Sequence, residues 1–323
     1  MKAIVVSELG GPEKLVLREH QLEEVKDTQV LIRTIRSSVN FADIQTVAGK
    51  YPAPPMPFVP GLDTFGEIVA VGSGIDRSWL GRRVVAFCDT GGYAQYCLAS
   101  QGLFFGVDDT LDPDQAGACP LLLGTCYGLL TRATKAGPDT TIAVHAAAGG
   151  IGTTAIQMAL ALGATNIVGI VSSAAKSAIV SDLGARCVVA PAGSSYSEAV
   201  IDAAGTKIDI VLNSVAGATI AEDLEMLAPF GTLVTFGMAS GTPGVAHSNQ
   251  LHRSSRTVAG YSFGHLRQMR PQEVAPIMTP ALALLNSGQI RMVIDSVFGL
   301  DAAPNSHVRL ASRQSIGKVL LAP

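Results

Sequence analysis

The spacing of hydrophobic residues changes near residue 118 and divides the chain into two parts. Before this point, short β-prone runs are broken by Gly, Pro and charged residues, which is the pattern of a β-rich domain. After it, continuous apolar runs alternate with stretches of helical spacing, which predicts a doubly wound parallel sheet. The strands expected in the first part are residues 2–6, 14–18, 29–37, 67–71 and 82–87, with a turn near 40–47.

The second part is predicted to begin with a helix over residues 120–136. Its strands are near-continuous apolar runs, as expected where both faces of a sheet are buried. The predicted strands are 141–145, 166–171, 187–189, 209–213, 231–236 and 256–261, and the helices between them are 151–162, 175–183, 198–203 and 218–227. A helix at 271–287 and strands at 295–300 and 317–321 form a tail too short for a domain, so we expect it to pack on the first part.

Small residues join the strand at 141–145 to the helix that follows. Ala146, Gly149 and Gly152 have the spacing A-x-x-G-x-x-G. Glycines let the backbone approach a pyrophosphate, and the first N–H groups of the helix attract its charge. A lone match can also be a tight turn packed by small residues, but here both flanking elements favour a dinucleotide site. The residues expected to bind the cofactor at this loop are Ala148, Gly149, Gly150, Ile151 and Gly152.

The end of the next strand indicates which dinucleotide binds. An NAD site usually carries Asp or Glu there for the ribose 2′-hydroxyl. This chain has Ser172, Ser173 and Lys176, with no acid before Asp182. Two hydroxyls and a cation can bind a 2′-phosphate, which a carboxylate would repel. NADPH is therefore expected in preference to NADH; the alternative is that Lys176 is only a solvated helix residue.

Composition and charge exclude several classes of function. Of 323 residues, 48% are hydrophobic and 15% charged, as in a soluble globular protein. The net charge is −3 and no dense run of Lys and Arg occurs, which argues against nucleic acid or membrane-surface binding. No apolar run is long enough to predict a membrane span, and no leader precedes Met1. The five cysteines are odd in number and lack CxxC, so we expect a reduced cytoplasmic protein without a disulfide framework or structural zinc.

Several short motifs occur in order along the whole chain. They include VNFAD at 39–43, PGLDTFGEI at 60–68, GGYAQY at 91–96, DIVLNSVAG at 209–217 and SIGKVLL at 315–321. Together they resemble the zinc-independent quinone oxidoreductases of the medium-chain dehydrogenase/reductase superfamily. The resemblance implies a GroES-like catalytic domain over residues 1–118, to which 264–323 return, and a Rossmann NADPH-binding domain over 119–263.

The resemblance also implies hydride transfer from NADPH to quinones or other electron-poor alkenes and carbonyls. Zinc-using relatives place Cys where this chain has Asn40, and a His-Glu pair where it has Leu62-Asp63. Since this set cannot ligate zinc, we expect no metal and an acceptor that is already electron-poor. Two alternatives stay open. One is an enoyl or 2-alkenal reductase that uses the same hydride step. The other is a non-enzymatic NADPH-binding structural or RNA-binding protein, which the complete glycine loop and the acidic net charge disfavour.

The family pattern points to candidate site residues. Asn40 and Asp43 lie on the segment that lines the cleft in this family, where they could bind nicotinamide, ribose or the substrate oxygen; the alternative is that they cap a turn and a helix. Tyr51 is the candidate for polarising or protonating the substrate oxygen, and the alternative is a tyrosine packed in a proline-rich loop. Further cofactor contacts are expected from Thr125, Asn213, Ser214, Phe236, Gly237 and Arg313; for Arg313 a surface salt bridge is the alternative.

Three further expectations follow from the family. Relatives commonly place a tyrosine that helps to hold the 2′-phosphate where this chain has Pro191, and Tyr196 is the candidate replacement. Members commonly pair through the last Rossmann strand, so we expect a homodimer through residues 256–262. Cys126 is expected to be buried packing, and the six histidines, which lack ligand spacing, are expected to be structural or exposed.

Overall fold

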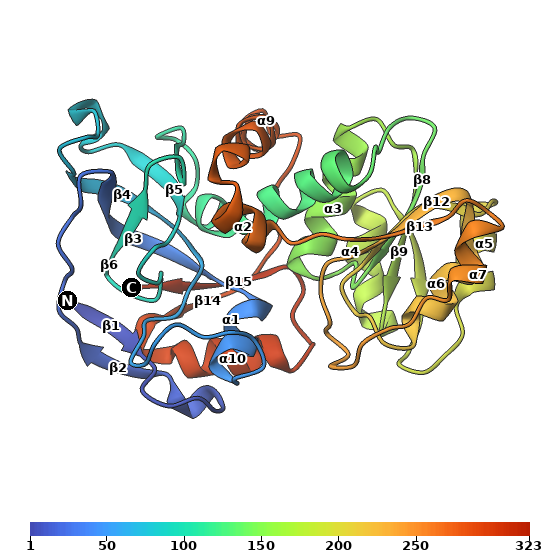
Figure 1. Cartoon of the computed structure of the whole chain (residues 1–323), viewed down its shortest axis with the longest axis horizontal. Helices are drawn as coiled ribbons and strands as arrows, with labels where there is room; N and C mark the ends of the chain where they lie inside the picture. The colour runs from blue at the N-terminus through green and yellow to red at the C-terminus, as the bar shows by residue number, and fades with distance from the viewer. The chain divides into compact units, whose positions relative to one another are not determined.

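The computed structural model describes every residue from Met1 to Pro323 and divides the chain into two compact units (Figure 1). The first unit contains Met1–Leu123, Leu266–Asn286 and Met292–Pro323, and the second contains Gly124–His265 and Ser287–Arg291. Most of the C-terminal tail therefore belongs to the first unit. The predicted fold class, a parallel α/β sheet together with a β-rich part, is confirmed.

Antiparallel strands build most of the first unit. The strands of this unit are β1 (Lys2–Val5), β2 (Val16–Glu19), β3 (Gln29–Val39), β4 (Asp63–Val71), β5 (Arg83–Phe87), β6 (Tyr96–Ser100), β7 (Phe104–Gly106), β14 (Ile294–Gly299) and β15 (Lys318–Ala322). Only the pair β14–β15 is parallel. The main sheet has the order β14-β15-β3-β4-β5-β7, with β6 also paired to β3, and β1 and β2 pair separately. Strands β6 and β7 were not predicted, because they are only five and three residues long.

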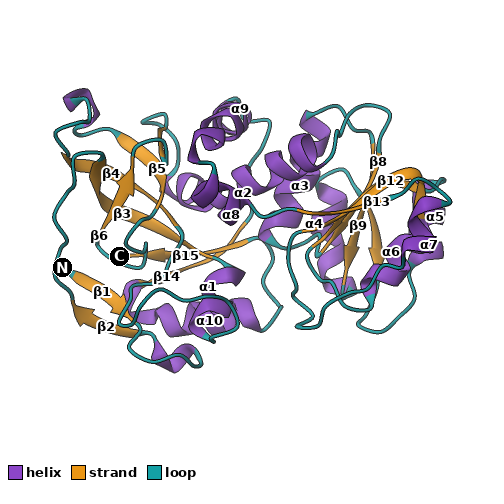
Figure 2. Cartoon of the chain, viewed as in Figure 1, coloured by secondary structure: helices purple, strands orange, loops and turns teal.

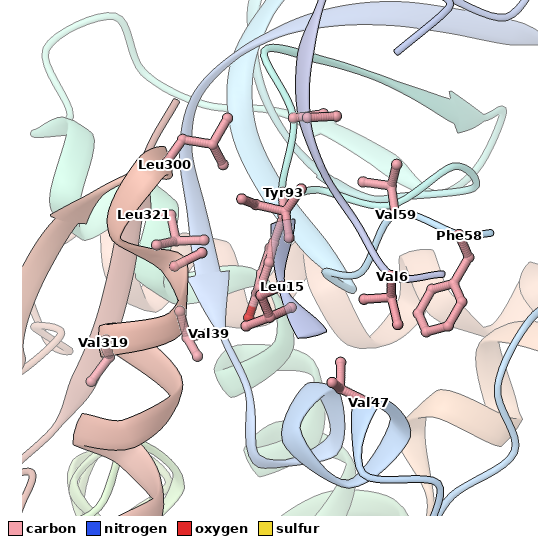
Figure 3. Packing of buried hydrophobic residues seen from close by; sticks show 14 residues of the cluster. Val6, Leu15, Val39, Val47, Phe58, Val59, Tyr93, Leu300, Val319 and Leu321 are labelled. Carbon is pink, nitrogen blue, oxygen red and sulfur yellow. The ribbon is translucent and has the colours of Figure 1, made fainter. Parts of the chain in front are cut away.

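Apolar residues from both ends of the chain form one core of the first unit (Figure 3). Helix α1 (Phe41–Val47) contributes Val47, and the C-terminal strand β15 contributes Val319 and Leu321. The short helix α10 (Ala303–Ala311), which the sequence did not predict, begins at the buried Ala303 of the same core. The expected helix at 271–287 is present as α9 (Val274–Asn286) after a 3-10 turn, and α8 (Phe263–Met269) was missed.

The second unit is a six-stranded, wholly parallel sheet. Its strands are β8 (Thr141–His145), β9 (Asn166–Val171), β10 (Arg186–Val189), β11 (Ile208–Asn213), β12 (Leu227–Thr235) and β13 (Thr257–Gly260). The order β10-β9-β8-β11-β12-β13 reverses direction between β8 and β11. Such a sheet binds its ligand at the carboxyl ends of the strands where the order reverses. A ligand site is therefore expected at the ends of β8 and β11.

Helices cover both faces of this parallel sheet (Figure 2). The helices are α3 (Gly150–Ala161), α4 (Ser177–Asp182), α5 (Ser197–Ala204), α6 (Thr219–Met226) and α7 (Ser248–His252), of which α7 was not predicted. Buried side chains of α5 and α6 pack on strand residues such as Val168, Val211 and Leu233. The strands are therefore covered on both sides, which explains their continuous apolar sequences.

Helix α2 (Pro113–Gly128) begins earlier than expected and continues as a π-helical turn at Leu129–Ala133. Asp112 accounts for the early start, because its Oδ1 accepts hydrogen bonds from the backbone N–H groups of Asp114 and Gln115 at 3.0 and 3.1 Å. Pro120, expected near the helix start, lies inside the helix. No helix of the structure has the length and apolar character needed to cross a membrane.

Candidate functional site

The glycine loop leaves the sheet at the end of its central strand, β8. Ala146 has φ of +49°, which turns the chain away from the strand. Gly149 is the N-cap of α3 and has extended backbone angles of −79° and 173°. The N–H groups of the first helical turn, at Gly150 and Ile151, have no carbonyl partner within the helix, so they are available to an anion. This is the donor set that a pyrophosphate requires.

Gly152 allows the start of α3 to lie against the loop. A Cβ atom at this position would lie 2.4 Å from the backbone oxygen of Ala146 and 2.5 Å from Cα of Ala147. Both of those atoms belong to the backbone, so no side chain could rotate away to make room. The close contact of loop and helix, and with it the direction of the free N–H groups, therefore requires glycine.

Except for Thr125, the other predicted cofactor residues of the second unit lie at or just after the carboxyl ends of strands. Ser172 and Ser173 are exposed after β9, and Lys176 is half-buried in the 3-10 turn Ala174–Lys176. Since β8, β9, β11 and β12 are parallel, their carboxyl ends share one edge. The remaining residues are Asn213 at the end of β11, Ser214 after it, Phe236 and Gly237 after β12, and Thr125, which is half-buried in α2.

Tyr196 does not replace the missing phosphate-binding tyrosine. Its side chain is buried, and its hydroxyl donates to Oδ1 of Asp223 at 2.9 Å and to the backbone oxygen of Thr219 at 3.0 Å. That expectation is wrong, because the start of α5 turns the ring toward α6. Sequence reasoning also missed Asp223, the centre of a buried polar cluster. The signal was an acid between Ile220 and Leu224, at a position of α6 that faces the core.

A second buried polar cluster lies in the first unit, at the start of α1. The Nδ2 group of Asn40 donates to Oδ1 of Asp63 at 2.7 Å, and the ammonium group of Lys318 donates to Oδ1 of Asn40. Ser38 Oγ donates to the same Asp63 oxygen, while Leu121 N–H donates to its other oxygen at 3.0 Å. Burial lowers the pKa of Lys318, and the nearby carboxylates of Asp63 and Asp43 oppose this shift. The amide of Asn40 is therefore held between a carboxylate and an ammonium group.

The carboxyl group of Asp43 continues this cluster. Its Oδ2 accepts from the Asn40 N–H at 2.8 Å and from the Tyr93 hydroxyl at 3.2 Å, and that hydroxyl lies 3.1 Å from Nε2 of His307. Burial raises the pKa of Asp43 to about 7 and lowers that of His307 to about 4. Asp43 thus caps helix α1, as the alternative to a functional role had it. Contacts of Asn40 and Asp43 with cofactor or substrate stay predictions.

Lys318, Tyr93 and His307 were not predicted as parts of a site. A single lysine beside the apolar run of β15 was the available signal for Lys318, since a charge flanked by buried residues is usually paired. Its partners lie on β4 and before α1, and nothing in the local sequence identifies them. His307 is buried, as one of the two expectations for the histidines had it.

The other predicted residues of the first unit lie at its surface. Tyr51 is half-buried in the loop after α1, where its N–H donates to the backbone oxygen of Gln45 at 3.1 Å. Arg313 is exposed after α10, with φ of +58°. In the second unit, Cys126 is fully buried and burial raises the pKa of its thiol, so it belongs to the packing as expected.

The side chains present do not form a metal site. No group of three or more His, Cys, Asp or Glu side chains is arranged to hold a metal ion. At the position where zinc-using relatives carry ligands, Asn40 and Asp63 are bonded to each other, and the ammonium group of Lys318 bonds to Asn40. A positive charge at this point disfavours a second cation.

The raised pKa of Asp43 predicts a pH-dependent stability. The pKa of this carboxyl group rises from its ordinary value of 3.8 to about 7 on folding. Between these two pH values, the folded state keeps a proton that the unfolded state releases. Stability from this group is therefore lost as pH rises through that range, by on the order of 4 kcal/mol. Asp43→Asn does not titrate, so its stability relative to the wild type should rise by this amount between pH 4 and pH 7. His307 titrates in both proteins and cancels from the difference, and urea unfolding at several pH values measures it. A flat difference would contradict the burial of Asp43.

Comparison with known proteins finds relatives of both units. Residues 26–119 match the family described as alcohol dehydrogenase GroES-like domain, and residues 150–279 match the family described as zinc-binding dehydrogenase. The sequence is 32% identical to a quinone oxidoreductase of Pseudomonas aeruginosa over 325 residues, which covers 100% of this chain and 99% of the relative.

Solved structures agree with this result. A quinone oxidoreductase of Escherichia coli complexed with NADPH is 28% identical and has a TM-score of 0.92, with 100% of both chains covered. A mycobacterial protein complexed with NADPH is 30% identical and also has a TM-score of 0.92, again with 100% of both chains covered. Both comparisons agree with the resemblance that the motifs of the sequence indicate.

Proposed function

Because this chain belongs to the medium-chain dehydrogenase/reductase superfamily, we propose that it is an NADPH-dependent quinone reductase that works without a metal ion. The observation that carries the proposal is the glycine loop after β8, whose free N–H groups and Gly152 contact fit a dinucleotide. When bound, NADPH supplies a hydride from its nicotinamide. The names of the quinone oxidoreductase relatives support a quinone as the acceptor.

The residues of the second unit bind and orient the cofactor. The N–H groups of Gly150 and Ile151 hold the pyrophosphate at the positive end of the α3 dipole. Ser172, Ser173 and Lys176 bind the 2′-phosphate at the end of β9, and the loops after β11 and β12 line the rest of the site. NADPH is the cofactor of the proposed reaction, which the two NADPH-complexed structures also support.

Removing the cation at the end of β9 should change the cofactor preference. Lys176→Ala is expected to raise KM for NADPH about tenfold, because a charge-assisted hydrogen bond to the 2′-phosphate is lost. KM for NADH, which lacks this phosphate, should stay within about twofold of the wild type. Steady-state kinetics with both cofactors measures the two values. If the wild type prefers NADH, or if both KM values rise together in the variant, Ser173 and Lys176 do not bind the 2′-phosphate.

Residues of the first unit orient the acceptor and assist the protonation of its oxygen. Tyr51 is the candidate that polarises the substrate oxygen as negative charge develops there. Asn40 and Asp43 complete this segment: their bonds to Lys318, Asp63 and Tyr93 hold the start of α1 in place. Without a Lewis acid, the acceptor must itself be electron-poor, which quinones are.

Tyr51→Phe is expected to lower kcat/KM by about tenfold rather than abolish activity, since a reduced quinone can also take its proton from water. Tyr96→Phe is the matched control, because Tyr96 is a half-buried tyrosine of β6 in the same unit and has no proposed role. Stopped-flow oxidation of NADPH with a quinone gives both values. An unchanged kcat/KM for Tyr51→Phe would remove Tyr51 from the mechanism.

An acceptor panel tests the proposed reaction against the enoyl or 2-alkenal reductase alternative. NADPH oxidation is followed with 1,4-benzoquinone, 9,10-phenanthrenequinone and crotonaldehyde. We expect kcat/KM for the quinones to exceed that for crotonaldehyde by about a hundredfold, equivalent to about 2.7 kcal/mol. Activity should not change when EDTA or zinc is added. A preference for crotonaldehyde, or a requirement for zinc, would overturn the proposal, and no oxidation with any acceptor would favour a binding protein.

We also propose that the enzyme is a cytoplasmic homodimer. All five cysteines are free thiols, in keeping with a reducing compartment. The edge strand β13 pairs on one side only, with β12, and a second copy could extend the sheet from it.

A further inference from the structure

A single buried carboxylate is bonded to the last residues of the two strands that flank the switch point of the parallel sheet. We propose that Asp223 is a positioning residue for the dinucleotide: it fixes the two loops between which the cofactor binds. The inference rests on the proposed cofactor site and adds a residue that lies behind it. Asp223 is fully buried on α6, so it cannot itself contact a ligand.

The contacts of Asp223 reach both strand ends. Its Oδ1 lies 2.7 Å from Nε2 of His145, the last residue of β8, and accepts the Tyr196 hydroxyl at 2.9 Å. Its Oδ2 accepts from Nδ2 of Asn213, the last residue of β11. His145 and Asn213 are 4% and 0% exposed, so water does not compete for these bonds.

Each of these strand ends leads into a loop in which one alanine has an unfavourable, positive φ angle. Ala146, directly after His145, has φ of +49°, and Ala216, three residues after Asn213, has φ of +59°. Residues other than glycine adopt this region only where surrounding structure holds them there. In the second loop, the side chain of Asn213 holds this conformation: its Oδ1 accepts from the N–H groups of Val215 and Ala216 at 2.7 and 2.8 Å.

The orientation of the Asn213 amide therefore depends on Asp223. With Nδ2 directed to Asp223 and to Oγ1 of Thr219 at 2.8 Å, Oδ1 must face the loop. His145, which contacts the same carboxyl group, is itself the last residue before the glycine loop. Loss of one acceptor oxygen at Asp223 would loosen both loops together, and the cofactor would bind to a less ordered site.

Glu222 provides a matched control. It precedes Asp223 on α6, and its carboxylate accepts from Tyr196 N–H at 3.0 Å, Ser197 N–H at 3.1 Å and Ser195 Oγ at 2.9 Å. All three donors lie at the start of α5 and none in the cofactor loops. Glu222→Gln and Asp223→Asn thus both replace a carboxyl group by an amide on the same helix, but only the second affects the strand ends.

The test measures NADPH affinity by nicotinamide fluorescence and amide exchange of Val215 and Ala216 by mass spectrometry. For Asp223→Asn we expect a Kd for NADPH about tenfold higher, equivalent to about 1.4 kcal/mol, with kcat at saturating NADPH within about threefold. Exchange at Val215 and Ala216 should be about tenfold faster without cofactor, as a weaker local bond allows. Glu222→Gln should change neither value by more than about twofold, even where its melting temperature falls.

The inference is overturned if Asp223→Asn leaves Kd unchanged, or if both variants weaken binding equally. Should Asp223→Asn fail to fold, His145→Phe is the second variant to test. It retains a ring against Tyr196, at 5.5 Å between ring centroids, and loses the contacts of Nε2 with Asp223 at 2.7 Å and with the Tyr196 hydroxyl at 3.5 Å. An unchanged Kd for His145→Phe would then refute the inference. If the wild type does not bind NADPH, the proposed function fails, while amide exchange still reports whether Asp223 orders the loop.

Discussion

Gly152→Val is expected to abolish cofactor binding and to lower kcat/KM with NADPH by at least about a hundredfold. The valine Cβ would begin 2.4 Å from the Ala146 oxygen and 2.5 Å from Cα of Ala147, well inside contact distance. Because both neighbours are backbone atoms, α3 or the loop must move, and either movement redirects the N–H groups that bind the pyrophosphate. Fluorescence titration with NADPH measures the loss directly.

Gly137→Ala is the matched control for this substitution. Gly137 lies in the same unit before β8, and a Cβ there would meet no atom within 4 Å. Its NADPH affinity and melting temperature should equal those of the wild type within experimental error. Normal NADPH affinity in Gly152→Val would show that the loop after β8 does not hold the cofactor, and the proposed function would lose the observation that carries it.

Lys318→Met is expected to be the most destabilising single change in the first unit, by about 3 kcal/mol. The methionine fills the space but leaves Oδ1 of Asn40 without its donor and removes the positive charge of Lys318, which interacts with the buried side chain of Asp63. Activity should fall as well, because the start of α1 is no longer held. Urea unfolding gives the change in the free energy of unfolding.

Two further variants distinguish this ionic effect from simple packing. Lys2→Met removes an exposed lysine of β1 in the same unit and should change stability by less than about 0.5 kcal/mol. The double variant Lys318→Met with Asp63→Asn removes both charges, so its loss should be smaller than the sum of the single losses by at least about 1 kcal/mol. Strict additivity would show that Lys318 does not interact with Asp63.

The contrast between these two sites explains which parts of the chain could be predicted. Strands β8 and β9 have the bounds expected from the sequence, Thr141–His145 and Asn166–Val171, because strands buried on both faces are continuous apolar runs. The glycine loop is equally local, since strand, turn and helix follow one another within a few residues. In the first unit, β6, β7 and α10 were not predicted, because short elements gain their stability from neighbours far along the chain.

Local sequence patterns were therefore sufficient to predict the parallel sheet, the glycine loop and the motif order that marks the family. The contacts between buried polar groups, of Lys318 with Asn40 and of Asp223 with both strand ends, became visible only in the folded chain. The fold also turned Tyr196 inward, away from the role expected of it. The physical reason is that backbone conformation follows from the local pattern of residues, whereas the charge state and orientation of a buried side chain depend on partners brought together by the fold.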